Sequence, residues 1–275
     1  MRRTDLRAFS AAVRRVAGSR PVRALPAAVG RRAAGSKPLQ ALRGRMTAAS
    51  ADGLLVRCPI CDHRADEFLV FGGGNVKRPN ALCAGCGALE RHRLVWLYLL
   101  NETDLFGGTE RRRMLHVAPE PVLEQRLRDE PLIDYLSADL DAGVAQEQMD
   151  ITDIHYPDSS FDVIYCSHVF EHVPDDAQAM RELCRVLRPD GWAILQVPIL
   201  LQRTDEAPTM TDPEERLRRF AQHDHVRAYG PDYADRLRAA GFVVRQDRYA
   251  DRIGAIRSRR YGLHPADVVH FCTKR

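Results

Sequence analysis

The chain lacks several features that would define its class at once. No apolar run approaches the ~18 residues that a membrane-spanning helix needs, and no secretory segment with a small-residue cleavage site is present. The glycine spacing GxGxxG, the phosphate-loop lysine and the HExxH pattern are also missing. We therefore expect no membrane span and no common nucleotide-loop or zinc-peptidase site. With 275 residues, of which 45% are hydrophobic, the chain can form one large domain, or one domain and a small module.

Positive charge is unevenly distributed along the chain. Of the 41 Lys and Arg, 12 lie in residues 1–50 beside the single acid Asp5, which leaves 29 bases against 36 acids in the rest. The first fifty residues are rich in Arg, Ala, Ser and Gly, and this composition predicts a disordered basic extension. An organelle-targeting segment, or an arm that contacts RNA or membrane, is an alternative. The acidic remainder argues against an obligate nucleic-acid binder.

Four of the seven cysteines form two tight pairs, Cys58–Cys61 and Cys83–Cys86, with 21 residues between the pairs. This doubled CxxC pattern predicts a structural zinc ribbon with four thiolate ligands and no open coordination position. Redox dithiols or two disulfides are the alternatives. The remaining cysteines stand among apolar residues and are expected in the core: Cys166, Cys184 and Cys272.

The segments around the second cysteine pair predict the rest of a module over residues 51–103. Residues 71–75 are glycine-rich and fit the tip of a loop between the two pairs. Residues 89–100 have helical periodicity, and the apolar face of this helix would dock the ribbon onto the main domain. The patch Arg91, His92 and Arg93 would face either a substrate or solvent at the start of the helix.

The most informative stretch runs from Met149 to Pro198. Asp150 closes a short apolar segment, a proline-containing turn follows, and an apolar strand is expected over 161–166. A polar loop, an amphipathic helix, the tight turn 189–191 and a second apolar strand to Val197 complete the pattern. It resembles the second half of class I S-adenosylmethionine-dependent methyltransferases of the type 11 group, and the resemblance covers about residues 112–272. It implies a Rossmann-like, mostly parallel, seven-stranded sheet with helices on both faces, in a domain over residues 104–275.

The expected first strand, residues 113–118, leads into the segment that departs most from this family. Where these enzymes have an acidic residue and a glycine-rich loop, this chain has His116 and then Ala118, Pro119 and Glu120. Glycines serve there because the cofactor approaches the backbone closely. We expect Ala118 and Pro119 to form this loop, and Glu120 to bind the methionine ammonium in place of the missing acid. A degenerate cofactor site is the alternative.

The resemblance places the other cofactor residues at the ends of the next strands. Asp139, at the end of the strand over 133–138, would accept both ribose hydroxyls, with Leu140 beside it. Asp150 would accept from the adenine amino group, and Ile151 would pack against the base. Ser167 closes the fourth strand, where the donor methyl group would lie. All of these strand ends gather at the carboxyl edge of the sheet.

Candidate general bases lie in two loops. His168, Glu171 and His172 follow the fourth strand, and His223 and His225 belong to an insertion over 199–225 that is long enough to form a lid. A base is needed only where the acceptor atom carries a proton. For Glu171 and His172 the alternative is capping of the following helix. For His223 and His225 it is structural hydrogen bonding. The segment 252–264 is expected to be a loop.

Together these features predict a cytoplasmic S-adenosylmethionine-dependent methyltransferase with structural Zn²⁺. Its acceptor would be a small molecule, glycan or natural product. Two alternatives are a zinc-ribbon enzyme that methylates ribosomal RNA bases and a catalytically degenerate, zinc-stapled interaction module. Acceptor atom and oligomeric state stay open at this point.

Overall fold

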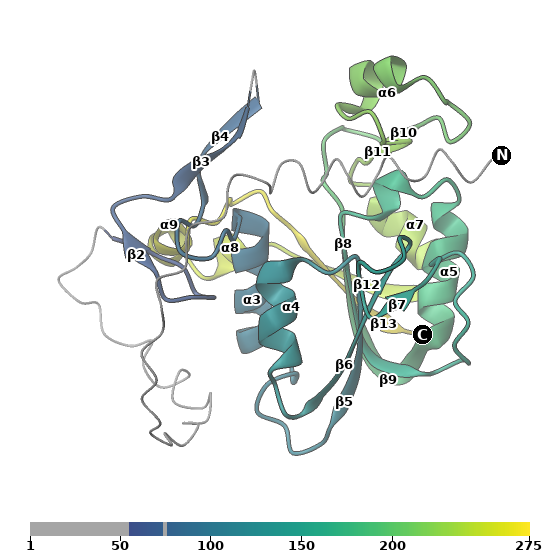
Figure 1. Cartoon of the computed structure of the whole chain (residues 1–275), viewed down its shortest axis with the longest axis horizontal. Coiled ribbons are helices and arrows are strands. Elements are labelled where there is room, and N and C mark those ends of the chain that lie inside the picture. Colours follow the sequence, from purple (N-terminus) through teal and green to yellow (C-terminus); the bar gives the residue numbers. More distant parts are fainter. Residues whose placement is uncertain (1–54, 74–75) are drawn as a thin grey trace. The chain divides into compact units, whose positions relative to one another are not determined.

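The computed structural model describes residues 55–73 and 76–275 (Figure 1). Its centre is a seven-stranded sheet in the order β12-β13-β9-β8-β5-β6-β7. These strands are β5 (Arg112–Val117), β6 (Ile133–Asp139), β7 (Glu147–Gln148), β8 (Phe161–Ser167), β9 (Leu187–Gln196), β12 (Phe242–Asp247) and β13 (Val269–Lys274). All neighbouring pairs are parallel except those of β13, which runs antiparallel to both β9 and β12. The predicted mostly parallel, seven-stranded sheet is confirmed.

Each face of the sheet has its own hydrophobic core, because successive strand residues point to opposite faces. Met114, Val163 and Ile194 belong to one cluster, which includes α3 (Glu90–Glu102) and residues of α4 (Pro121–Arg128). Leu115 and Ile164 belong to the other, which includes α5 (Asp176–Val186) and α7 (Tyr233–Ala239). Helices therefore cover both faces, as predicted, and the described residues lie in one compact unit, Ala49–Arg275.

The expected turn over 189–191 is part of strand β9 instead. Phe161 of β8 pairs with Leu187, but Val163 pairs with Trp192, so residues 188–191 form a bulge in the ladder. Gly191 is required in this bulge because a Cβ there would lie 2.6 Å from the Asp162 carbonyl oxygen. The bulge lets β9 begin directly after α5 and still enter the sheet in register.

The cysteine-bearing segment forms short antiparallel ribbons: β1 (Val56–Arg57) with β2 (Arg64–Ala65), and β3 (Leu69–Gly73) with β4 (Val76–Leu82). The glycine-rich tip falls between β3 and β4, and its residues 74–75 lie outside the described part, as does the predicted basic extension, residues 1–50. Helix α3 follows Cys86, and the Trp96 indole nitrogen donates to the Pro59 carbonyl at 3.1 Å. The predicted docking helix over 89–100 is therefore confirmed.

Arg93 of α3 fastens this ribbon to the C-terminal part of the domain. Its fully buried guanidinium donates to four backbone carbonyls and lies 3.7 Å from the centre of the Phe68 ring. The four acceptors are Ala81 at 2.8 Å, Ala88 at 2.9 Å, Tyr261 at 2.6 Å and Gly262 at 2.9 Å. Arg93 thus faces neither a substrate nor solvent, and both expectations for it are wrong, because its fork of N–H groups is taken up by four backbone carbonyls.

The insertion after β9 contains β10 (Asp205–Glu206), α6 (Pro213–Phe220) and β11 (Arg227–Ala228), with β10 antiparallel to β11. The segment 252–264, predicted to be a loop, instead contains the end of α8 (Tyr249–Arg252) and all of α9 (Ala255–Tyr261). Gly254 and Gly262, both with positive φ, bound α9 and hid its periodicity in the sequence. Among the described residues, no helix has both the length and the apolar character that crossing a membrane requires.

Candidate functional site

Ala118, Pro119 and Glu120 form the turn between β5 and α4 at the carboxyl edge of the sheet. Ala118 has φ +48°, in the left-handed region where a side chain is strained and glycine is favoured. Its backbone nitrogen donates to the Ala138 carbonyl of β6 at 2.8 Å. The loop therefore holds Ala118 in a backbone conformation that glycine would adopt without strain.

His116 and Glu120 together place a carboxylate at the end of β5. His116 Nε2 lies 3.0 Å from Glu120 Oε2, and because a carboxylate only accepts, Nε2 carries the hydrogen of this bond. The other imidazole nitrogen lies 2.8 Å from the Tyr135 hydroxyl, and the Tyr165 hydroxyl donates to Glu120 Oε1 at 3.3 Å. Burial, the largest single influence, raises the Glu120 pKa, but the His116 hydrogen bond and the neighbouring His92 and Arg91 together outweigh it, and the pKa falls to about 2. The carboxylate is therefore ionised.

His92, at the start of α3, brings the ribbon-bearing segment to this carboxylate. Its Nδ1 accepts from the Leu89 backbone nitrogen at 3.1 Å, and its Nε2 lies 3.8 Å from Glu120 Oε1. Burial lowers the His92 pKa to about 3. Sequence reasoning missed His92, Tyr135 and Tyr165 as neighbours of Glu120, since nothing in their spacing reveals which sheet face or helix start they share.

The other acids expected to bind the cofactor lie at the ends of β6 and β7. Asp139 ends β6, where its Oδ1 accepts from the Asp141 backbone nitrogen at 2.9 Å, and Leu140 beside it is exposed. Asp150 follows β7, and its Oδ1 accepts from the Thr152 backbone nitrogen at 2.8 Å. Ile151 next to it is buried. Because β5, β6 and β7 are neighbouring parallel strands, their ends share one edge of the sheet.

Ser167 and His168 end β8 at the same edge. Ser167 is buried, and the His168 backbone nitrogen donates to the Gln196 carbonyl at 2.9 Å. His168 has φ +57°, a strained backbone conformation for a non-glycine residue. Its Nδ1 lies 3.3 Å from Glu171 Oε1, which directs the imidazole toward the short helix η1 (Phe170–His172).

Glu171, His172 and His225 form a buried cluster behind His168. One carboxylate oxygen and one nitrogen from each histidine lie within 4.8 Å of one another, and the two rings stack edge to face at 4.5 Å. Burial lowers the pKa of His172 to about 4 and also lowers that of His225. For Glu171, burial is the largest single influence and raises the pKa, but the hydrogen bond with His168 and the neighbouring His172 and His225 together outweigh it and lower the pKa to about 2.

Neither Glu171 nor His172 caps α5, so the alternative that these two residues cap the following helix is wrong. Asp175 is the cap of α5, accepting from the Gln178 backbone nitrogen at 2.9 Å. His223 does not join the cluster. It is exposed, and its Nδ1 lies 3.7 Å from the Glu214 carboxylate of α6.

A fully buried arginine that sequence reasoning missed holds His225 against Glu171. Arg227 donates to the carbonyls of Phe170 at 2.7 Å, Pro174 at 2.9 Å and Val173, while the Val226 nitrogen donates to the Glu171 carbonyl at 2.9 Å. These bonds join the insertion to η1 along several consecutive residues. The sequence gives no signal for this pairing because the partners are more than fifty positions apart.

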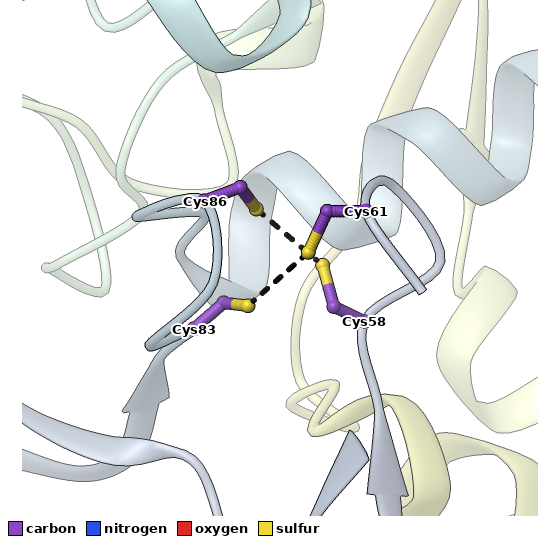
Figure 2. A group of neighbouring side chains, drawn as sticks. All are labelled: Cys58, Cys61, Cys83 and Cys86. Atoms are coloured by element: carbon purple, nitrogen blue, oxygen red, sulfur yellow. Dashed lines mark hydrogen bonds between the residues drawn. The ribbon is translucent and has the colours of Figure 1, made fainter. Parts of the chain in front are cut away.

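The four cysteines of the ribbon converge on one point, with their sulfur atoms facing one another (Figure 2). The Cys58–Cys86 and Cys61–Cys83 sulfur pairs are each 3.7 Å apart, and none of the four forms a disulfide. Four sulfurs at ~2.3 Å from a tetrahedral zinc ion are about 3.8 Å from one another. The spacing of the thiols therefore fits such an ion. Cys166, Cys184 and Cys272 are buried in the core, as predicted.

A surface depression of about 540 Å³ lies at a different place, at the carboxyl end of β12. Its lining is almost entirely charged, and Arg252 there pairs with Glu102 at 2.8 Å and Asp247 at 3.0 Å. None of the predicted site residues lines it.

Comparison with known proteins relates this edge of the sheet to one family. Residues 82–195 match the family model described as a methyltransferase domain. Methyltransferase GfsG of Streptomyces halstedii is 36% identical over 128 residues, which cover 46% of this chain and 41% of that protein. The 27-O-demethylrifamycin SV methyltransferase of Amycolatopsis mediterranei is 43% identical over 54 residues, or 20% of each chain. The chain thus spans less than half the length of these curated relatives.

Solved structures also match. An S-adenosylmethionine-dependent methyltransferase from Mesorhizobium loti is 15% identical, with a TM-score of 0.43 over 62% of this chain and 94% of the other.

Proposed function

We propose that this chain, whose residues 82–195 match the family model of a methyltransferase domain, transfers the methyl group of S-adenosylmethionine to a small acceptor of the natural-product class. The observation that carries the proposal is the Glu120 carboxylate. β5 has His116 at the position where an acidic residue is expected. His116 hydrogen-bonds to Glu120 at 3.0 Å, so a carboxylate still lies at this strand end. The departure in sequence is thereby compensated in space.

The residues at this edge fit the parts of S-adenosylmethionine. Glu120, whose side chain is 15% exposed, would pair with the methionine ammonium. Asp139 at the end of β6 would accept from the ribose hydroxyls, and Asp150 with the buried Ile151 would hold the adenine. Ala118 and Pro119 would let the backbone approach the cofactor. Ser167 and His168, at the end of β8, would lie next to the transferred methyl group.

The methyl group moves by in-line displacement, in which the acceptor atom bonds to the methyl carbon while the carbon–sulfur bond breaks. The bonding pair goes to sulfur, which leaves as a neutral thioether. Alignment and exclusion of water supply much of the rate, since effective molarities reach about 10⁵ M or more. His168 directly follows the end of β8, is half-buried, and would accept the proton of a hydroxyl or amine acceptor.

Two observations support an apolar small-molecule acceptor. Ile199, Leu200 and Leu201 directly follow β9 and are all exposed, Leu200 by 55%. Two of the relatives are a methyltransferase named GfsG and an enzyme named for demethylrifamycin SV. An apolar patch beside the predicted donor position would bind such a molecule without needing strong charge.

Binding and turnover test the proposal separately. Isothermal titration of the metallated full chain with S-adenosylmethionine should show saturable heat, and the exposed-site variant Asp129→Asn should match the wild type. Incubation with methyl-tritiated cofactor and a panel of small molecules, glycans and RNA should label small molecules. Absence of binding heat sinks the assignment, whereas label in RNA alone would overturn the acceptor class.

We also propose that Cys58, Cys61, Cys83 and Cys86 hold a structural Zn²⁺, supported by their 3.7 Å sulfur spacings. Four thiolates complete the coordination shell, so this ion has no catalytic position. Removing it should loosen the start of α3 and with it His92 beside Glu120. The Cys83→Ser variant should therefore lose one bound zinc and bind S-adenosylmethionine more weakly, whereas Cys184→Ser, in the core, should keep its zinc.

A further inference from the structure

We propose that Glu171, His172 and His225 bind a second divalent metal ion, of the Zn²⁺ or Mn²⁺ class, at the carboxyl end of β8. The three side chains come from two segments, η1 and the insertion before β11, that meet only in the folded chain. One ligand atom from each lies within 4.8 Å of the other two. A single ion at the ~2.0–2.2 Å bond lengths of nitrogen and carboxylate ligands can contact all three.

The strongest indication is that buried polar atoms of Glu171 and His225 have no hydrogen-bond partner among the described residues. His225 is 2% exposed, and neither of its ring nitrogens makes a hydrogen bond with the described residues. Glu171 is 1% exposed, and its Oε2 also has no hydrogen-bond partner there. A buried polar atom without a partner destabilises the fold, and proteins retain few of them. A metal ion would satisfy a nitrogen of His225 and the oxygen of Glu171 together.

The cluster is also held in place before any ion binds. The Val226 nitrogen bonds to the Glu171 carbonyl at 2.9 Å, and Arg227 bonds to the Phe170 carbonyl at 2.7 Å. These contacts fix the two segments on both sides of the ligands. His168 Nδ1, 3.3 Å from Glu171 Oε1, orients the carboxylate, as groups around metal ligands commonly do.

The donor set indicates the class of metal. Two imidazoles and a carboxylate favour first-row divalent ions over Mg²⁺ or Ca²⁺, which prefer oxygen ligands. Three protein ligands leave at least one position open, unlike the closed set of four thiolates in the ribbon. The second site therefore differs from the first in being able to accept an outside ligand.

This inference extends to the acceptor, where it rests on the proposed function. An acceptor hydroxyl bound at the open position would lose its proton to His168 more readily, because a bound metal lowers the pKa of an attached oxygen. The oxygen would then bond to the methyl carbon as the carbon–sulfur bond breaks, with the pair passing to sulfur. The acceptor class implied is therefore a hydroxylated molecule, methylated on oxygen.

Metal content tests the site without requiring cofactor or turnover. Full-length protein is equilibrated with Zn²⁺, dialysed against metal-free buffer and measured by plasma mass spectrometry. Since each site holds one ion, we expect about two zinc ions per chain in the wild type, and about one in His225→Ala and Glu171→Gln. The matched control is His223→Ala, which removes a nearby exposed histidine and should keep both ions.

Co²⁺ absorption supplies an independent readout. With zinc kept in the ribbon, Co²⁺ at the cluster should give visible bands without the thiolate charge-transfer bands that cysteine ligands produce. Glu171→Gln keeps the side-chain shape and decides the matter if circular dichroism shows His225→Ala to be unfolded. A single zinc per chain in the wild type, or unchanged metal content in Glu171→Gln, overturns the proposal. A chain that binds both ions but no S-adenosylmethionine would instead refute only the proposed function.

Discussion

Replacement of Ala118 by glycine should stabilise the protein, the reverse of the usual effect of this change. Ala118 has φ +48°, where an L side chain costs roughly 1–2 kcal/mol. Glycine removes that strain but gives the unfolded chain more freedom, at a cost of about 0.5–1 kcal/mol. The difference predicts a gain of about 0.5–1 kcal/mol in the free energy of unfolding. Affinity for S-adenosylmethionine should not fall, because the backbone keeps its shape.

Equilibrium urea unfolding measures this gain, with Ala239→Gly as the matched control. Ala239 is an exposed residue in the last turn of α7, where glycine should cost up to about 1 kcal/mol. The two variants make the same chemical change and are expected to shift the unfolding midpoint in opposite directions. If both shift it downward by similar amounts, the backbone at Ala118 is not strained. The argument that this position favours glycine is then wrong.

Three further substitutions test the roles of Glu120, Asp176 and His270. Glu120→Gln should weaken S-adenosylmethionine binding about 10- to 100-fold, since a hydrogen bond to a charged group contributes about 1.5–3 kcal/mol; calorimetric affinity that stays at the wild-type level would contradict this. Asp176→Asn should lower the free energy of unfolding by about 3–5 kcal/mol, because this buried carboxylate pairs with Arg236 at 2.6 Å and accepts from Tyr229 at 2.6 Å; urea denaturation measures the loss. His270 is buried and its pKa is lowered to about 4 from 6.5, so the unfolded chain takes up this proton first as the pH falls. Stability should therefore be full above about pH 6.5 and decline toward pH 4, by up to about 3 kcal/mol from this residue; His270→Asn should flatten the decline, and an unchanged slope would rule out its contribution.

The sheet could be predicted from the sequence because its signals are local. Largely apolar runs such as 161–166 and 192–197, each bounded by turn residues, are typical of buried strands. The paired cysteines are also a local signal, and their thiols converge as expected. Helix α9 was missed for a local reason as well, since it is short and arginine-rich and lies between two glycines. A pattern with few apolar residues gives no periodicity to detect.

The site was only partly predictable because its key contacts join distant segments. The sequence indicated that Glu120 replaces a missing acid, but not that His116 would hold it there or that His92 would approach it from α3. His168, Glu171, His172 and His225 were predicted as bases from their residue type and from their place in two loops. Which of them share a cluster depends on the bonds that Arg227 makes more than fifty residues away, and no spacing rule encodes those bonds.

Arg93 constrains the order in which the chain can mature. Its guanidinium needs carbonyls from residues 81 and 88 and also from residues 261 and 262, which are synthesised 168 and 169 positions after Arg93. The cysteine module can form its short ribbons early in synthesis, but it cannot reach its final position until residues 261 and 262 have been made. Until then the Arg93 guanidinium stays hydrated. The module and the first turn of α3 are fixed only when the end of α9 supplies its carbonyls.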